Sequence, residues 1–136
     1  MKLLLIYCDE FEYKPQVKTL EEVEEKSEGQ RFEKCLLAMI QSEEHDEEDL
    51  SGTEKKLVKN LKWAAKKNET RNVILHSFAH LSESKAGPDF TIELFNRAEA
   101  RMKNADYECS QTAFGYFMDL DIKAPGRSQA RIFKAF

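Results

Sequence analysis

The sequence contains no long apolar segment. No apolar run approaches the ~20 residues that a helix needs to cross a bilayer. The opening run from Lys2 to Ile6 is too short for the apolar part of a signal peptide, and Asp9 and Glu10 follow it at once. We therefore expect a cytoplasmic protein with no membrane partner.

Glycine is also scarce. The chain has five glycines, and none belongs to a glycine-rich phosphate loop, a dinucleotide-binding fingerprint or a nucleophile elbow. An enzyme driven by a nucleotide is therefore not expected, and we predict no cofactor.

The three cysteines are Cys8, Cys35 and Cys109, and they stand far apart. Their odd number and wide spacing favour reduced thiols over a disulfide framework. Cys8 follows the first apolar run and could act as a nucleophile near His80. A buried structural thiol is the preferred interpretation, because free cysteine is among the most buried residues.

Positive charge is not in excess. The formal net charge is −4, so no global positive field attracts nucleic acid, although a local basic patch could still bind RNA. The 136 residues suit one domain, residues 1–136, and this length can bury a core without disulfides or metal.

Apolar patterning predicts an α+β domain with a mixed sheet and two main helices in the crossovers between strands. A turn at Asp9 and Glu10 should separate the first two strands. The acidic segment 43–49 indicates a solvated loop, and 21–30 a short helix or a loop. With both helices on one face, a second copy of the chain or a curled sheet must cover the other. The expected strands are 3–7, 11–15, 35–40, 72–75, 106–110, 113–122 and, from a weaker pattern, 130–136.

Each helix has a recognisable start. Ser51 to Glu54 fits a capping box, and Gly87-Pro88-Asp89 is typical of a helix amino terminus. Trp63 points away from the apolar face of the first helix, and we interpret it as a partly exposed ring covered by lysine side chains. The apolar faces comprise Leu57, Val58, Leu61, Ala64 and Ala65 in the first helix, and Phe90, Leu94, Phe95, Ala98 and Met102 in the second.

Two segments could carry chemistry: 76–82, just after an apolar strand, and 114–118. His76 and His80 straddle the strand end and would lie about 13 Å apart on an extended strand, with no third ligand in view, so we predict no metal site. From spacing alone, His80 and the aromatic residues of 114–118 suit a structural role. Aromatic rings beside a glycine could equally stack on a nucleobase.

At these residues the chain resembles a known family, the archaeal-type amino-terminal editing domain of threonyl-tRNA synthetase, a relative of D-aminoacyl-tRNA deacylase. The resemblance begins with Met1 to Tyr7 and Asp9…Phe11-Glu12-Tyr13. It continues through Phe78-Ala79-His80-Leu81-Ser82 and Phe114-Gly115-Tyr116, so it covers essentially the whole chain.

The resemblance implies a D-aminoacyl-tRNA deacylase-like fold and a proofreading hydrolase in translation, which cleaves the ester of mischarged seryl-tRNA(Thr). Threonine and serine differ by one methyl group, and binding alone discriminates such a difference only by roughly 1–3 kcal/mol, so a second sieve is needed. Implied partners are the aminoacylated 3′ end of tRNA, a second copy in a homodimer, and a threonyl-tRNA synthetase. The positions of the family motifs imply catalysis by His80 and substrate binding by Ser42, Phe78, Ala79, Phe114, Gly115, Tyr116, Phe117 and Met118. We also assign Arg127 and Arg131 to tRNA binding, although the family carries other residues at these positions.

The chain also departs from the family pattern. Met118 stands where the family carries a lysine, and Arg131 where it carries a glutamate. Ser42 replaces a pocket residue that is usually apolar. Two alternatives therefore stand beside the deacylase: a non-catalytic homologue that binds an aminoacyl-adenosine or tRNA, and a deacylase for another aminoacyl-tRNA. The end at Phe136 and the altered motifs favour a free-standing homologue over an excised domain.

Overall fold

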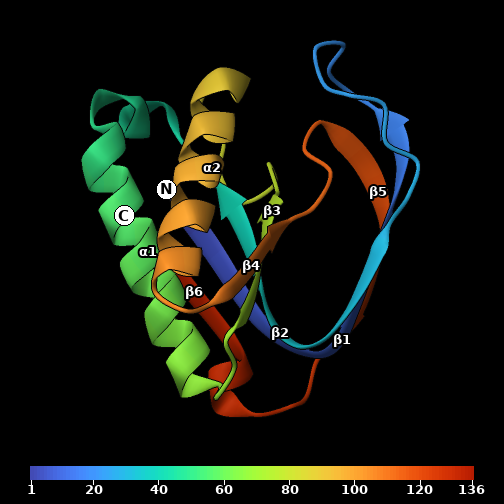
Figure 1. Cartoon of the computed structure of the whole chain (residues 1–136). Helices are drawn as coiled ribbons and strands as arrows, with labels where there is room; N and C mark the ends of the chain where they lie inside the picture. Colours follow the sequence, from blue (N-terminus) through green and yellow to red (C-terminus); the bar gives the residue numbers. More distant parts are fainter.

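Six strands form one mixed sheet, and two long helices cover one of its faces (Figure 1). The computed structural model describes all residues from Met1 to Phe136. The elements in chain order are β1 (Lys2–Lys18), β2 (Gln30–Gln41), η1 (Glu44–Glu48), α1 (Leu50–Lys67), β3 (Asn72–Ser77), α2 (Pro88–Asn104), β4 (Glu108–Gln111), β5 (Tyr116–Lys123), η2 (Ser128–Ala130) and β6 (Arg131–Ala135).

The sheet has the strand order β4-β3-β2-β1-β5, and β6 also pairs with β1. β1 is antiparallel to β2, β5 and β6, whereas β2, β3 and β4 run parallel. The carboxyl ends of these three parallel strands therefore meet at one edge, and ligands of α/β sheets commonly bind at such an edge.

The predicted turn at Asp9 and Glu10 is wrong, because β1 is one continuous strand of 17 residues. Cys8 pairs with Cys35 and Glu10 with Glu33, so the ladder to β2 passes through the expected turn. The first part of β1 pairs with β6 on its other side, and the part from Glu10 onward pairs with β5. Charged side chains on a strand can face solvent without interrupting its backbone hydrogen bonds.

The predicted loop at 43–49 contains the short 3-10 helix η1. Its Asp46 is buried rather than solvated. The Asp46 carboxylate accepts a hydrogen bond from Glu43 N (2.7 Å) and pairs with the Met1 ammonium (3.2 Å), and these contacts offset the cost of burying its charge. The capping box at Ser51 is also wrong: Asp49 caps α1 by accepting from Gly52 N at 2.9 Å.

Glu54, the expected capping partner, has another role. It is buried, and its carboxylate bonds Arg97 and, at 3.0 Å, Arg101 on α2. These ion pairs join the two helices.

The helix faces agree with the prediction. The predicted residues of α1 are all buried, and so are those of α2 except the half-buried Phe90. They pack on strand residues that include Leu3, Leu5 and Leu36. Trp63 is partly exposed, with the amines of Lys134 and Lys67 at 4.6 and 5.7 Å from the ring centre. This agrees with the interpretation of Trp63 as a partly exposed ring covered by lysine side chains. No helix combines the length and apolar character needed to cross a membrane.

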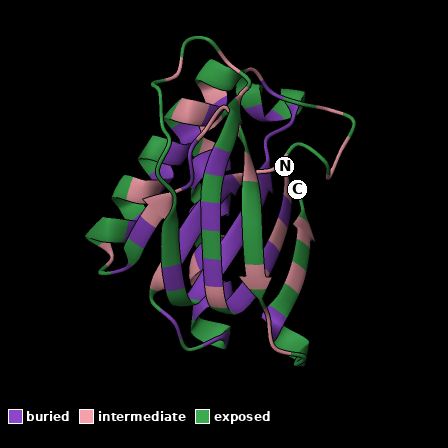
Figure 2. Ribbon diagram, turned by 90° about the vertical axis from the view of Figure 1, so that its right-hand side faces the viewer, coloured by how far each residue is buried: buried purple, intermediate pink, exposed green.

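A second apolar cluster lies on the face without helices. Figure 1 shows that the long β1–β2 hairpin and β5 bend away from the helices. Phe11 and Phe32 stack there with ring centres 6.1 Å apart. Figure 2 shows buried and exposed residues alternating along the strands of this sheet. Phe133 stays exposed, so the curl covers only part of the face.

Candidate functional site

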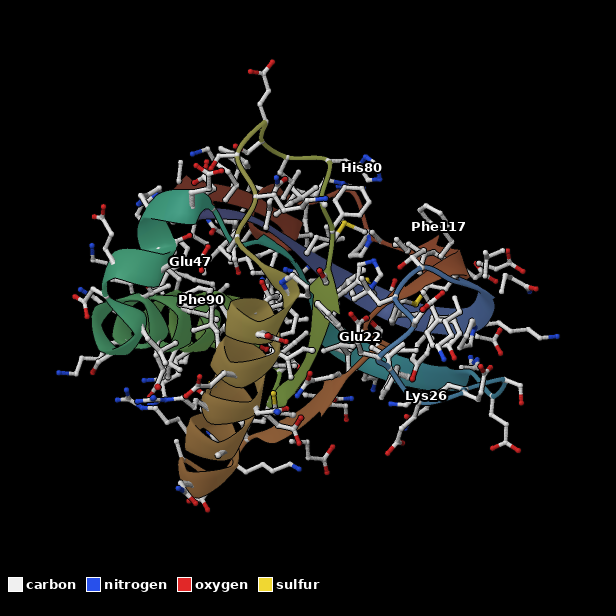
Figure 3. The ribbon with its side chains drawn as sticks, turned by 90° about the horizontal axis from the view of Figure 1, so that it is seen from above. Glu22, Lys26, Glu47, His80, Phe90 and Phe117 are labelled. Atoms are coloured by element: carbon white, nitrogen blue, oxygen red, sulfur yellow. The ribbon has the colours of Figure 1, made fainter.

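A cavity of about 380 Å³ opens at the edge where the parallel strands end. Its walls come from the end of β2, the loop after β3, the first turn of α2, the loop 112–115 and the start of β5, with Thr19 and Leu20 closing one side. Figure 3, seen from above, shows His80 and Phe117 at this opening.

The structure brings nine predicted site residues together around this cavity. Sequence segments far apart in the chain thus form one site. The lining residues are Ser42, Phe78, Ala79, His80, Phe114, Gly115, Tyr116, Phe117 and Met118.

His80 lies on an exposed loop that Gln41 holds in place. The Gln41 side-chain oxygen accepts from Leu81 N (2.6 Å) and Ser82 N (2.7 Å), and its amide donates to Ser82 O and Ser84 O, both at 2.8 Å. Phe78 touches His80 edge-on, with ring centres 5.0 Å apart. The loop is therefore fixed by a buried side chain of the adjacent strand, although its own residues are largely exposed.

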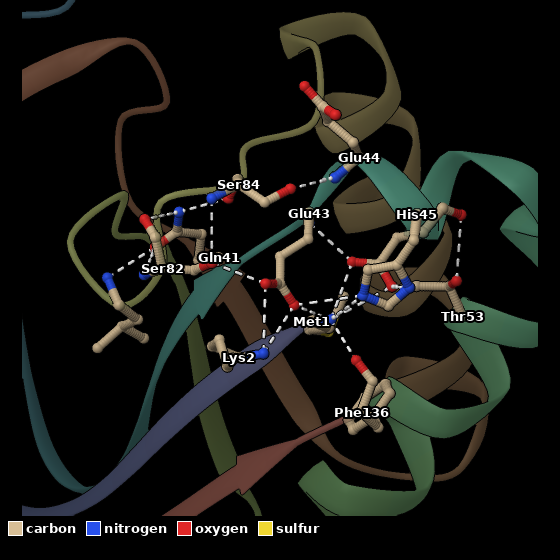
Figure 4. A network of polar contacts seen from close by, with 12 residues as sticks. Met1, Lys2, Gln41, Glu43, Glu44, His45, Thr53, Ser82, Ser84 and Phe136 are labelled. Atoms are coloured by element: carbon tan, nitrogen blue, oxygen red, sulfur yellow. Dashed lines mark hydrogen bonds and ion pairs between the residues drawn. The ribbon is translucent and has the colours of Figure 1, made fainter.

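Glu43 bonds the same loop at Ser82 (Figure 4). It accepts a hydrogen bond from Ser82 Oγ at 2.7 Å and pairs with the Met1 ammonium at 2.6 Å and with Lys2 Nζ at 3.1 Å. Burial disfavours the charged carboxylate, but the hydrogen bonds from these groups and from His45 outweigh it and hold the pKa of Glu43 at about 2.

Glu43, His45 and Asp46 also form a group of close potential metal ligands. The Met1 ammonium already lies between the two carboxylates, and Lys2 adds a second cation. A metal ion would have to displace this ammonium, so we assign the group a structural role. Neither His76 nor His80 belongs to it.

The opposite wall is formed by 114–118. Gly115 has φ = +84°, in the region that favours glycine, and an added Cβ would lie 3.0 Å from Val23 Cγ1. The Tyr116 hydroxyl accepts from Lys26 N and donates to Glu24 O, both at 2.8 Å. Tyr116 thus holds the β1–β2 connection, on which Figure 3 labels Glu22 and Lys26.

Met118 lines the cavity and packs against the second apolar cluster, so this wall presents no cation. Phe117 is 64% exposed at the rim. Lys85 is the lysine that lines the cavity, and its ammonium makes no hydrogen bond or ion pair within the protein. Sequence reasoning missed Lys85, because only the loop's return past His80 brings it to the opening.

Polar side chains form the buried floor of the cavity, and among them sequence reasoning assigned only Ser42 to substrate binding, although it also singled out His76. His76 Nδ1 lies 2.8 Å from Thr112 Oγ1, a bond that joins β3 to the opposite wall. Burial lowers the pKa of His76 to about 4, so its imidazole is neutral at neutral pH. Thr91 Oγ1 donates to Gly87 O at 3.2 Å. Thr112 could have been suspected because it stands next to a strand end, but the sequence alone does not reveal its hydrogen bond with His76.

The cysteines take no part in the site. All three are buried, and none lines the cavity. A hydrogen bond with Cys35 and burial raise the pKa of Cys8, which favours the inert thiol. Burial likewise raises the pKa of Cys109 to about 12.

Arg127 and Arg131 do not line the cavity. They lie where α1 ends and β6 begins, at the far end of the molecule in Figure 1. The Arg127 guanidinium lies 4.7 Å from the ring centre of Tyr7 and donates to Asn68 Oδ1 at 2.8 Å, and Arg131 donates to Pro125 O at 3.0 Å. Both guanidinium groups are therefore remote from the cavity.

These elements define the D-aminoacyl-tRNA deacylase-like class of α+β folds. The whole chain superposes on 99% of the solved c-Myc DNA Unwinding Element Binding Protein, with a TM-score of 0.60 and 11% sequence identity. At this identity the likeness concerns the fold alone.

The chain belongs to the family described as the archaea-specific editing domain of threonyl-tRNA synthetase, whose profile matches residues 1–136. Similar curated proteins are the Threonine--tRNA ligases of Thermococcus sibiricus, 30% identical over 135 residues, and of Methanothrix thermoacetophila, 30% identical over 128 residues. The matches cover 97% and 93% of this chain but 22% and 20% of those proteins. The chain therefore spans about a fifth of the length of the curated relatives it matches.

Proposed function

We propose that this domain proofreads aminoacyl-tRNA by hydrolysing the ester bond of a mischarged amino acid, with seryl-tRNA(Thr) as the first candidate substrate. Family membership supports the proofreading role. The observation that carries the proposal is the convergence of both motif segments on one cavity at the carboxyl edge of the sheet.

The reaction needs a water and a place for the negative charge that develops on the ester oxygen. Water attacks the carbonyl carbon, the bond to the ribose oxygen breaks, and a proton passes to that oxygen. The backbone N–H groups of Ala79 and His80 make no hydrogen bond within the protein and lie beside the opening, so they are available to stabilise an oxyanion. The His80 imidazole would orient the water or the amino acid.

The test is to incubate the protein with Ser-tRNA(Thr) and with Thr-tRNA(Thr) and to follow loss of the ester. We expect Ser-tRNA(Thr) to decay faster than in buffer, and Thr-tRNA(Thr) to decay no faster than in buffer. His80→Ala should slow the reaction, whereas Lys59→Ala, which removes an exposed side chain of α1 outside the cavity, should leave its rate unchanged. No decay of either ester above buffer would contradict the proposal.

A non-catalytic binding module is the second candidate, and the Met118 side chain favours it. A thioether carries no charge and accepts hydrogen bonds only weakly, and the remaining lysine, Lys85, is exposed at the opening. This alternative predicts that a non-hydrolysable seryl-adenosine analogue binds while Ser-tRNA(Thr) stays intact. A deacylase for another aminoacyl-tRNA predicts that a different member of a panel of aminoacyl-tRNAs is cleaved.

The partners proposed are tRNA, a second copy of the chain and a threonyl-tRNA synthetase. Arg127 and Arg131 lie far from the cavity, so they could contact only a larger part of the tRNA. Arg127→Ala and Arg131→Ala should then slow hydrolysis of full-length Ser-tRNA(Thr) but not of a seryl ester of adenosine. Light scattering during gel filtration tests the homodimer, which predicts twice the 15.8 kDa chain mass.

A further inference from the structure

The cavity floor contains one buried hydroxyl without a partner. Ser42 is 4% exposed and lines the cavity, and its Oγ makes no hydrogen bond. Its backbone oxygen accepts from Ala86 N at 2.9 Å, so the residue is anchored while its side chain remains unpaired. Buried polar side-chain atoms are nearly always hydrogen-bonded, which makes this hydroxyl an exception that needs a partner from outside the protein.

The neighbouring polar groups do not supply that partner. Gln41 and Glu43 hold the loop after β3, and Thr112 bonds His76. The other buried unpaired side-chain atom is Tyr107 Oη, which does not line the cavity. Ser42 Oγ is therefore the unpaired buried side-chain atom of the floor, with the apolar side chains of Ile40 and Ala86 also lining the cavity.

The depth of Ser42 limits which part of a ligand can reach it. Ala79, His80 and Phe117 at the opening are exposed, whereas Ser42 is buried. The aminoacyl group is the small terminal part of the ligand, so in a cavity of about 380 Å³ we place it at the floor and the ester and ribose nearer the opening. The part that points inward is the side chain of the amino acid.

We propose that Ser42 determines specificity: its hydroxyl hydrogen-bonds the side-chain hydroxyl of the aminoacyl group and selects it over an apolar group of similar size. This inference rests on the proposed aminoacyl ligand. Serine and alanine differ by the one oxygen that Ser42 would contact. A single neutral hydrogen bond of ordinary strength corresponds to a preference of about tenfold.

The experiment measures binding of two non-hydrolysable ligands, 3′-seryl-amino and 3′-alanyl-amino adenosine, by isothermal titration. The wild-type protein should prefer the seryl ligand about tenfold, and Ser42→Ala should reduce the ratio to about one. Ser42→Thr keeps the hydroxyl and should keep the preference. Ser110→Ala removes the same atom from β4, outside the cavity, and should leave the ratio unchanged.

The outcomes separate the two claims. An unchanged seryl preference in Ser42→Ala, or no seryl preference in the wild-type protein, would show that Ser42 does not select the ligand hydroxyl, and it would overturn the inference while the proposed ligand class stands. Binding of neither ligand by the wild-type protein would overturn both. Ser42→Cys, which keeps the size but donates weakly, provides a second variant if the alanine protein fails to fold, and its preference should fall below threefold.

Discussion

The loop after β3 is held by buried polar side chains of β2, whereas the wall formed by 114–118 is held by backbone pairing with β1, apolar packing and one tyrosine hydroxyl. Gln41 alone makes four hydrogen bonds to the first wall. The second wall joins the β1–β2 connection through Tyr116 and presents Met118 to the cavity. The wall with the Phe-Ala-His motif is thus positioned by side-chain hydrogen bonds, and the wall that departs from the family motif is positioned by the sheet backbone and has fewer side-chain hydrogen bonds.

The largest effect is expected at Gln41. Gln41→Ala removes four hydrogen bonds, each contributing about 1 kcal/mol, so the free energy of unfolding should fall by about 3–4 kcal/mol. Urea denaturation measures this change. Gln16→Ala, which removes one exposed bond to Asp119, should change stability by less than about 0.5 kcal/mol. Equally small losses of unfolding free energy in Gln41→Ala and Gln16→Ala would contradict the claim that the Gln41 side chain holds the loop after β3.

Acid should lower the stability of the protein through His76, whose hydrogen bond to Thr112 joins the two walls. Above pH 6.5 His76 is neutral in the folded and the unfolded chain and has no effect on pH dependence. As the pH falls, the unfolded chain binds a proton near pH 6.5 but the folded one only near pH 4, so stability falls across this window by up to about 3 kcal/mol. Unfolding at a series of pH values measures the slope, and His76→Gln should remove it.

Protonation of Glu43 should lower the stability of the protein further, at lower pH. Its folded pKa of about 2 lies below the ordinary value of 4.5, so the stabilisation is complete above pH 4.5 and is lost as the pH falls toward 2. A slope between pH 6.5 and 4 that persists in His76→Gln would contradict the assignment of the two windows.

The second wall should loosen when Tyr116 loses its hydroxyl. Tyr116→Phe removes two partly exposed hydrogen bonds to the segment 24–26 and should lower the free energy of unfolding by about 1 kcal/mol. Limited proteolysis within 19–29 should become faster. Tyr13→Phe is the matched control, because its hydroxyl has no partner in the protein. Equal cleavage rates in all three proteins would show that backbone pairing and apolar packing hold this wall without the Tyr116 hydroxyl.

The smallest effect is expected on the rate of ester hydrolysis when a charge is added to the second wall at Met118. Met118→Lys places a cation at the cavity and should raise the rate of seryl-ester hydrolysis several-fold, because a cation stabilises negative charge near the ester. Met118→Leu keeps the wall apolar and should leave the rate as in the wild type. If the lysine variant is no faster than the leucine variant, charge at this position does not limit the reaction.

The sequence predicted the helix faces and most strands because their apolar periodicity is long. It misplaced the turn at Asp9 because pairing on both sides carries β1 through two charged residues, which local pattern cannot reveal. Glu54 fitted a cap by spacing, but its ion pairs to Arg97 and Arg101 depend on how the helices pack.

For the site, short motifs identified both walls, because each motif is contiguous in the chain. The contacts that position them are not contiguous: Gln41 bonds residues 40 and more positions away, and His76 meets Thr112 only after α2 and β4 are in place. Residue type likewise does not specify the end of the sheet at which a side chain lies: Arg127 and Arg131, which we assign to tRNA binding, lie away from the cavity.

The most direct measurement of the central claim is the single-turnover rate of Ser-tRNA(Thr) deacylation with the protein in excess. The account predicts a rate above that in buffer, slowed both by His80→Ala and by Gln41→Ala, which leaves His80 in place but releases its loop. A rate equal to that in buffer, or one that neither substitution changes, would contradict an ester-hydrolysing site on the loop after β3.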